Sequence, residues 1–172
     1  ALIDSPGFQE FGLHHIDPAQ LAAYMPDLKP HVANCRFYNC THLHEPGCGV
    51  MAAISRLTAR GEELYVAPQV LVEFWVVATR PTNVNGFGWA TPLVVSEIGQ
   101  ILGQFPLLDE PSDLFTDWLA LVTARDIKGR KAHDVKLVAL MQAKGISHVL
   151  TFNVADFSGY AGIAPIDPVN VV

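Results

Sequence analysis

The sequence has no long uninterrupted run of apolar residues. A membrane-spanning helix needs about 18 or more of them. The most apolar stretch, LYVAPQVLVEFWVVAT at 64–79, is interrupted by Pro68, Gln69 and Glu73. No basic segment precedes an apolar segment at the start of the sequence, so the pattern predicts no secretory signal. We therefore expect no membrane association and a cytoplasmic location.

Cysteine and positive charge are also scarce. The three cysteines all lie between residues 35 and 48. An odd number of clustered cysteines does not form a framework of paired disulfides and favours metal binding in a reducing compartment. The net charge of −6 argues against binding of nucleic acid by overall charge. Basic residues are nevertheless concentrated locally, at Arg125, Lys128, Arg130, Lys131 and Lys136. A solvated helix flank and an RNA-binding surface are both consistent with this cluster.

Half of the 172 residues are hydrophobic, which is enough for one domain with a substantial core. Apolar spacing and the positions of proline and glycine predict helices and strands that alternate along the chain. The predicted helices cover 18–25, 50–61, 68–79, 91–104, 113–125 and 133–143, and the predicted strands 1–4, 63–67, 105–108, 147–152 and 163–167. This alternation favours a three-layer α/β fold with a mainly parallel sheet.

The segment CRFYNCTHLHEPGC at 35–48 has the composition of a zinc site. Cys35, Cys40, His42 and Cys48 supply three thiolates and one imidazole, which suits the tetrahedral coordination of Zn²⁺. Four protein ligands would close the site, so its predicted role is structural, and such modules gain about 10–16 kcal/mol from the metal. His44 is an alternative ligand, and three free cysteines beside a surface histidine are the simpler alternative.

Residues 1–52 resemble part of the ribosome-assembly GTPases of the RsgA type, through the DSPG at 4–7 and the Cys-Cys-His-Cys pattern. The resemblance implies that the four zinc ligands named above match the metal ligands of that family. The phosphate-binding loop G-x-x-x-x-G-K-[ST] and an N-K-x-D-type motif are absent from the sequence, so the resemblance does not extend to GTP hydrolysis.

Several acidic residues lie where packing alone would not place them. Glu73 falls among valines in a predicted helix, and an ionised carboxylate on an apolar face is costly unless it is paired or bound to a metal. Asp134 opens the predicted helix at 133–143, and Asn153 and Asp156 follow the strand at 147–152, where sites form in open α/β sheets. Helix capping or exposure at a polar edge explains each of them alone. Together they predict a site for a hard cation such as Mg²⁺ or Mn²⁺, as in a metal-dependent nuclease.

Residues 53–172 resemble a PIN domain of the VapC toxin type, through APQVLVEFWVVATRP (67–81), NGFGW (85–89) and AHDVKLVALMQAKGISHVLTFNVADF (132–157). The resemblance implies a PIN-like fold, cleavage of single-stranded RNA with Mg²⁺ or Mn²⁺, a homodimer and an antitoxin partner. The implied site residues are Glu73, Asp134 and Asp156, with Thr151 and Asn153 beside them. The candidate RNA contacts are Arg80, Arg125, Lys128, Arg130 and Lys131.

The first acid of that family, in a D-[TS]-N-like motif, has no direct counterpart. Asp4, at the end of the apolar strand ALID, is the hypothetical replacement and would complete a magnesium site with the other three acids. The chain therefore resembles two families joined near residues 50–57, with one part at 1–52 and the other at 53–172. Three interpretations follow: a metal-dependent ribonuclease, an inactive chimera with structural zinc, and an RNA- or ribosome-binding module.

Overall fold

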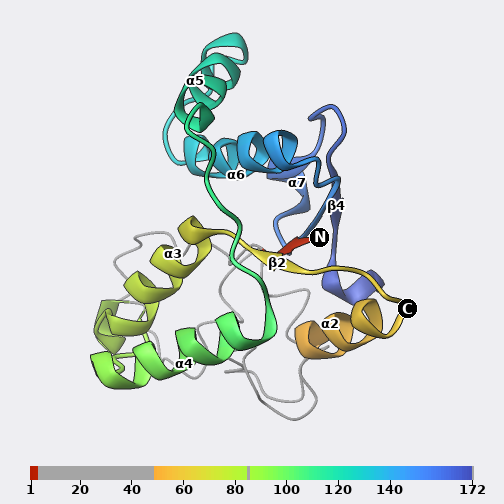
Figure 1. Cartoon of the computed structure of the whole chain (residues 1–172). Coiled ribbons are helices and arrows are strands. Elements are labelled where there is room, and N and C mark those ends of the chain that lie inside the picture. Colours follow the sequence, from red (N-terminus) through yellow and green to blue (C-terminus); the bar gives the residue numbers. More distant parts are fainter. Residues whose placement is uncertain (4–48, 85, 172) are drawn as a thin grey trace.

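The computed structural model describes residues 1–3, 49–84 and 86–171 (Figure 1). The predicted helix at 18–25, the four zinc ligands and Asp4 lie outside these residues. The described helices are α2 (Gly49–Ala59), α3 (Pro68–Thr79), α4 (Thr91–Gln104), α5 (Leu114–Ala124), α6 (Lys131–Lys144) and α7 (Val154–Phe157), with short 3₁₀ helices η3 (Thr82–Val84) and η4 (Pro168–Asn170). The strands are β1 (Leu2–Ile3), β2 (Tyr65–Val66), β3 (His148–Leu150) and β4 (Ala164–Ile166). No helix of the described residues has the length and apolar character needed to cross a bilayer.

The four strands form one sheet in the order β2-β1-β3-β4, and all neighbouring pairs are parallel. Leu2 of β1 pairs with Tyr65 on one side and with Val149 on the other, so the first residues of the chain lie inside the sheet. The predicted strand at 105–108 is reduced to a single bridge between Val66 and Leu107. The predicted α/β class with a parallel sheet is confirmed, whereas the finer PIN-like assignment stays a prediction.

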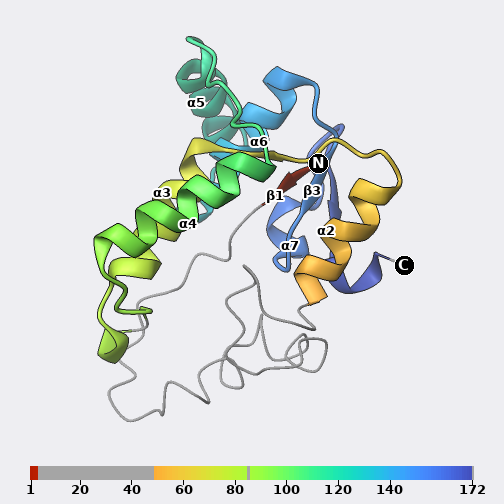
Figure 2. The same ribbon diagram turned by 60° about the horizontal axis from the view of Figure 1, so that its bottom comes forward.

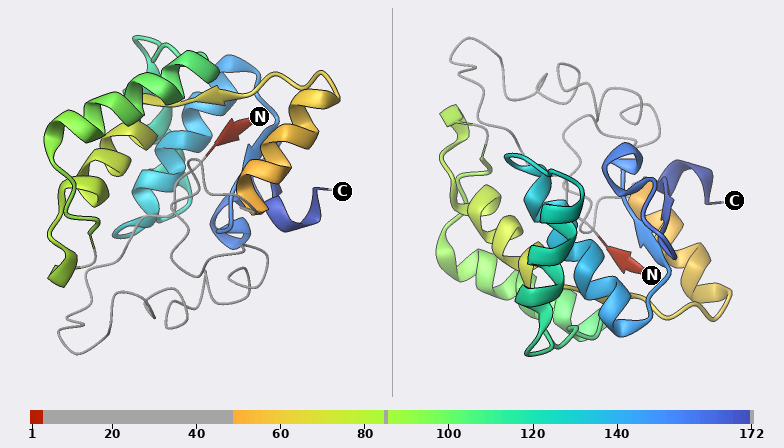
Figure 3. Two further views of the ribbon diagram at one scale, coloured as in Figure 1. Left: turned by 90° about the horizontal axis from the view of Figure 1, so that it is seen from below. Right: turned by 90° about the horizontal axis from the view of Figure 1, so that it is seen from above.

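The hydrophobic core lies on both faces of the sheet. One cluster joins Leu2 and Val149 to α3, α5 and α6. The other joins Leu150 to α2 and to Val171 after η4. Neighbouring residues of β3 thus point to opposite faces, as expected for a strand buried on both sides. The helices α3 and α4 lie on the opposite side of the molecule from α2 and the C-terminus (Figures 1 and 3).

The helices α3 and α4 lie next to each other and are joined by a tightly folded loop (Figure 2). Three backbone amides of this loop, those of Phe87, Gly88 and Trp89, donate to carbonyls of Val77, Arg80 and Ala78 at 2.8–3.0 Å. A Cβ at Gly86 would lie 2.0 Å from the carbonyl oxygen of Arg80, so only glycine fits there. The loop therefore fixes the backbone at the end of α3.

The predicted boundary between 1–52 and 53–172 falls inside α2, a continuous helix from Gly49 to Ala59. The division into two parts stays a prediction.

Candidate functional site

The predicted acids Glu73, Asp134 and Asp156 lie on three helices that follow or flank the ends of parallel strands. Glu73 belongs to α3, which begins directly after β2 and Ala67. Asp134 lies in the first turn of α6, and Asp156 in α7, which starts four residues after β3 ends. This arrangement agrees with the rule that sites in open parallel sheets form beyond the carboxyl ends of the strands.

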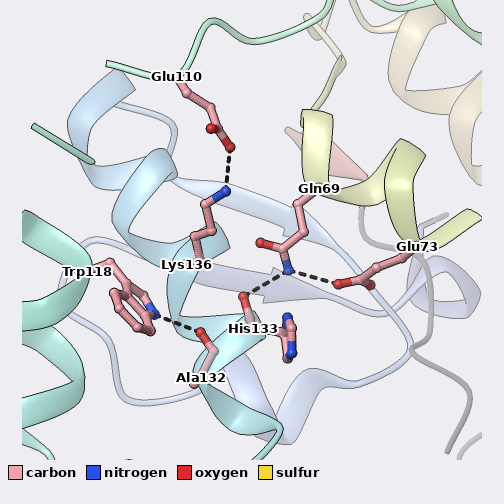
Figure 4. A network of polar contacts seen from close by, with 7 residues as sticks. All are labelled: Gln69, Glu73, Glu110, Trp118, Ala132, His133 and Lys136. Atoms are coloured by element: carbon pink, nitrogen blue, oxygen red, sulfur yellow. Dashed lines mark hydrogen bonds and ion pairs between the residues drawn. The ribbon is translucent and has the colours of Figure 1, made fainter. Parts of the chain in front are cut away.

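Gln69 links α3 to the start of α6 (Figure 4). Its Nε2 donates to Glu73 Oε1 at 2.9 Å and to the carbonyl oxygen of His133 at 3.0 Å. The same turn of α6 is held from the other side, because Trp118 Nε1 donates to the carbonyl oxygen of Ala132 at 2.9 Å. Two side chains from other helices thus donate to backbone carbonyls in the first turn of α6, next to Asp134.

The Gln69 amide is satisfied on one side only. Its Oε1 is buried and has no hydrogen-bond partner among the described residues. The opposite amide orientation would turn Oε1 toward two acceptors, the Glu73 carboxylate and the His133 carbonyl, so the orientation with Nε2 toward them is the favourable one.

The carboxyl of Asp134 is the perturbed acid of the group. Burial raises the pKa of Asp134 to about 6, and the negative charges of Asp156 and Glu73 add to the effect. Lys131 and His133 oppose it. The charges of Glu73 and Asp156 therefore act on Asp134.

Asp156 has partners of its own. Lys131 Nζ lies 3.1 Å from its Oδ1, and Asn153 Nδ2 donates to its Oδ2. Thr151 is buried, and its Oγ1 accepts from the backbone N–H of Asn153 at 3.0 Å. These hydrogen bonds link Thr151 at the end of β3, through Asn153, to Asp156 in α7.

These interactions give the acids structural explanations. Glu73 accepts a hydrogen bond from Gln69, and Asp156 is paired with Lys131. Asp134 lies in the first turn of α6, where the helix dipole favours a negative charge, although burial and the neighbouring acids oppose it. No three of the described His, Cys, Asp and Glu side chains are arranged to hold a metal ion. The predicted fourth acid, Asp4, lies outside the described residues.

Most of the candidate RNA contacts are already engaged within the chain. Arg125 Nη2 donates to the carbonyl oxygen of Gly159 at 2.8 Å, and its guanidinium lies 4.1 Å from the ring centre of Tyr160. Lys128 lies 2.8 Å from Asp126, although both side chains are about four-fifths exposed, so this pair contributes little. Arg80 and Arg130 make no side-chain hydrogen bond or ion pair with the described part of the chain.

The sequence analysis did not identify the hydrogen bonds and ion pair that hold the predicted acids and the start of α6 in place. Gln69 is four residues before Glu73, a spacing at which helical side chains meet, and this signal was available. The contacts of Gln69 with His133, of Trp118 with Ala132 and of Lys131 with Asp156 join different elements and carry no local signal.

Comparison with known proteins finds relatives for part of the chain. A protein named small ribosomal subunit biogenesis GTPase RsgA from Variovorax paradoxus (strain S110) is 70% identical over 54 residues, which are 31% of this chain and 17% of the relative. Proteins of the same name from Paraburkholderia phymatum (54% over 67 residues, 38% of this chain and 21% of the relative) and Bordetella pertussis (62% over 53 residues, 31% and 18%) are also similar. The chain thus spans about a fifth of the length of these relatives. No family model and no solved structure matches the chain.

The comparisons correct the main functional prediction. The relatives are named as ribosome-biogenesis GTPases, which contradicts the PIN- or VapC-type ribonuclease and the toxin–antitoxin assignment. The physical reason for the error is that acidic residues near helix starts are also common for structural reasons. Asp134 lies in the first turn of α6, where the helix dipole favours a negative charge, and Asp156 forms an ion pair with Lys131. The resemblance of one part of the chain to RsgA proteins is confirmed.

Proposed function

We propose that this chain is an RNA-binding module that associates with the small ribosomal subunit. The observation that carries the proposal is the 70% identity over 54 residues to a protein named for biogenesis of that subunit. The matched length is close to that of residues 1–52, which carry the resemblance in the sequence. We assign subunit recognition to this segment.

Zinc is the proposed cofactor of the recognition segment. Cys35, Cys40, His42 and Cys48 are soft and borderline ligands of the kinds that structural zinc sites use, and three of them are all the cysteines of the chain. Bound zinc would stabilise the segment and present its side chains to RNA.

The basic residues of the α5–α6 loop are the proposed contacts for RNA phosphates. Lys128 and Arg130 are exposed, and the loop is anchored by Ile127, whose backbone N–H donates to the carbonyl oxygen of Val122 at 3.0 Å. Arg125, Lys131 and Arg80 are the remaining candidates. Such contacts would make binding strongly dependent on salt.

GTP hydrolysis is not proposed for this chain, because its sequence has no phosphate-binding loop. Binding of Mg²⁺ or Mn²⁺ by Asp4, Glu73, Asp134 and Asp156 stays a prediction, and the proposed function does not depend on it.

The test is co-sedimentation of the full chain with purified small ribosomal subunits at several salt concentrations, with large subunits as a specificity control. We expect binding to small subunits only. The double substitution Cys35→Ser and Cys40→Ser should remove bound zinc and lower affinity at least about tenfold, or more than 1.4 kcal/mol. Lys128→Gln with Arg130→Gln should weaken binding and reduce the salt slope by about 1 for each phosphate that is no longer neutralised.

The matched control carries Arg56→Gln and Arg60→Gln, which remove the same charge from exposed positions on and just after α2. This control should bind as the parent does. A parent chain that contains zinc but binds neither subunit contradicts the proposal and favours the inactive-scaffold interpretation. Equal weakening in the control and in the loop variant would attribute binding to overall charge and remove the loop from the proposal.

A further inference from the structure

Helix α5 leaves a large aromatic side chain in solvent. Asp117 is the one charged residue among the eleven of this helix, yet Leu114 is its one buried residue. Phe115 is 67% exposed. Phenylalanine is among the residue types most often buried, and a ring that is so exposed adds little to the stability of the fold.

The ring of Phe115 is held in place by Trp118. The two ring centres are 5.4 Å apart, and the planes are inclined by 41°. Trp118 is itself fixed, because its Nε1 donates to the carbonyl oxygen of Ala132 at 2.9 Å and its ring packs against the hydrophobic core (Figure 4). Phe115 is therefore an exposed ring on a rigid support, which lowers the entropy lost when it contacts a ligand.

The hydrogen bond to Ala132 places this aromatic pair beside the basic start of α6. Ala132 follows Arg130 and Lys131, and both of these residues are exposed. Arg130 makes no side-chain hydrogen bond or ion pair with the described part of the chain. The Lys131 side chain is 66% exposed, although its Nζ lies 3.1 Å from Asp156. Positive charge is thus available next to the exposed ring.

The acids of this part of α5 point away from the ring. Asp113 and Asp117 lie two residues before and after Phe115, about 200° around the helix axis from it. Trp118 and Leu119, three and four residues after Phe115, share its face. The face of α5 that carries the ring is therefore aromatic and uncharged, with cations at one edge.

A ligand that matches this surface has a flat aromatic face beside a negative charge. Each nucleotide of RNA has both, and stacking on an aromatic side chain is possible for every base. We propose that Phe115 is a stacking site for an unpaired base of RNA, with Arg130 and Lys131 on the phosphates next to that base. The inference rests on the proposed function and extends it from phosphate contacts, which carry no base information, to the bases.

The base that stacks must be unpaired, because neighbouring pairs cover the faces of bases within a duplex. A protein partner suits this surface less well, since charged residues are depleted at the centres of protein interfaces and exposed cations border this ring. The α5 helix lies at one end of the molecule, on the outer side of α6, where a strand of RNA can reach it (Figure 1).

The experiment compares two labelled oligomers of about ten nucleotides by fluorescence anisotropy. One is single-stranded oligoadenylate, and the other is an abasic oligomer of the same length and charge. The parent should bind oligoadenylate about fivefold to tenfold more tightly, because only this oligomer can stack. Phe115→Leu keeps an apolar side chain and should reduce the preference to less than about twofold, with unchanged affinity for the abasic oligomer. Phe115→Tyr keeps the ring and should keep the preference.

Two further variants serve as controls. Trp75→Leu removes another exposed aromatic ring, which lies on α3 and is 36% exposed, and should keep the preference of the parent. Arg130→Gln should weaken binding of both oligomers by the same factor, as expected for a contact with phosphate. Far-ultraviolet circular dichroism should be the same for the parent and Phe115→Leu, because the ring is mostly exposed.

Three results overturn the stacking site: equal binding of both oligomers by the parent, a preference that survives Phe115→Leu, and an equal loss in Trp75→Leu. Co-sedimentation with small ribosomal subunits separates these results from the proposed function. Subunit binding by a parent that does not prefer oligoadenylate removes the stacking site and leaves the proposed function in place. If Phe115→Leu then weakens subunit binding, the ring contacts protein. A parent that prefers oligoadenylate but binds no subunit supports the stacking site and removes the ribosomal assignment.

Discussion

Helices α3 and α6 show opposite relations between composition and burial. α3 has a single charged residue in twelve, yet only Val70, Val77 and Ala78 are buried. α6 contains three lysines, a histidine and an aspartate among fourteen residues. Six of its residues are nevertheless buried: Val135, Leu137, Val138, Ala139, Leu140 and Met141. The difference comes from their neighbours. Among the described residues, α6 packs against α5, α7 and one face of the sheet, whereas α3 packs against α4 and the core and leaves its outer side exposed.

This contrast shows that apolar composition predicts a buried surface but not what covers it. In α6 the covering comes from the same chain, and the polar residues lie at the helix ends and on the remaining flank. In α3 the described residues leave an apolar stripe exposed. Substitutions in the two helices test whether this difference in burial produces a difference in the free energy of unfolding.

The largest effect is expected from truncation in α6. Leu140 is 1% exposed, so Leu140→Ala should lower the free energy of unfolding by about 2–5 kcal/mol through poorer packing and a residual cavity. Val72→Ala on the outer face of α3, at 62% exposure, should change it by no more than about 0.5 kcal/mol. Urea unfolding at low protein concentration measures both. Similar destabilisation of the two variants would mean that both helices are covered to the same degree.

The next effect concerns the end of α3. Gly86→Ala should destabilise the protein by about 1–3 kcal/mol, because the added Cβ would lie 2.0 Å from the Arg80 carbonyl oxygen and the loop must move. The control is Gly99→Ala in α4, where a Cβ meets nothing within 4 Å and should stabilise the helix by about 0.5–1 kcal/mol. Thermal unfolding distinguishes the two. Equal effects of one sign would show that the loop is not the constraint on α3.

The smallest effect concerns the polar start of α6. The pKa of Asp134 rises from 3.8 to about 6 on folding, so the folded state binds the proton more tightly than the unfolded state. Stability should therefore be greatest near pH 4, fall as the pH rises through this interval and level off above it. Asp134→Asn should remove this fall and raise stability at pH 7 by about 1–2 kcal/mol, a value reduced for the partial solvent exposure of the group.

Urea unfolding of parent and Asp134→Asn at pH 4.5 and pH 7 measures the effect. The exposed Asp113, just before α5, supplies the control Asp113→Asn, which should keep the pH dependence of the parent. A parent whose stability rises over this interval would contradict the assigned direction of the Asp134 shift.

The helices were predictable where proline, glycine and apolar spacing agree. α3 and α4 have the predicted bounds because Pro68 and Pro92 mark their first turns and an extended residue ends each of them. α6 begins two residues earlier than predicted, at Lys131, since nothing in the loop before it is a strong start signal. The strand at 105–108 failed because its pairing with β2 depends on a distant segment, which supplies only one bridge at Leu107.

The predicted acids lie near one another in the structure, and their role as a site stays a prediction. Glu73, Asp134 and Asp156 are near one another, as expected from acids that follow parallel strands. Gln69 donates to Glu73, and Lys131 and Asn153 contact Asp156, so these two acids also have structural roles. Only the tertiary structure shows the contact between Lys131 and Asp156.

The sequence by itself determined the alternation of strands and helices, the α/β class and the resemblance of one part to RsgA proteins, because these depend on local spacing and short motifs. Only the tertiary structure decided that Leu2 lies in the middle of the sheet, that Gln69 joins α3 to α6, and that α3 keeps an exposed apolar stripe. Each of these depends on which distant residues meet. The apolar periodicity of one segment predicts which face of a helix or strand is buried. Which element packs against that face depends on the rest of the fold.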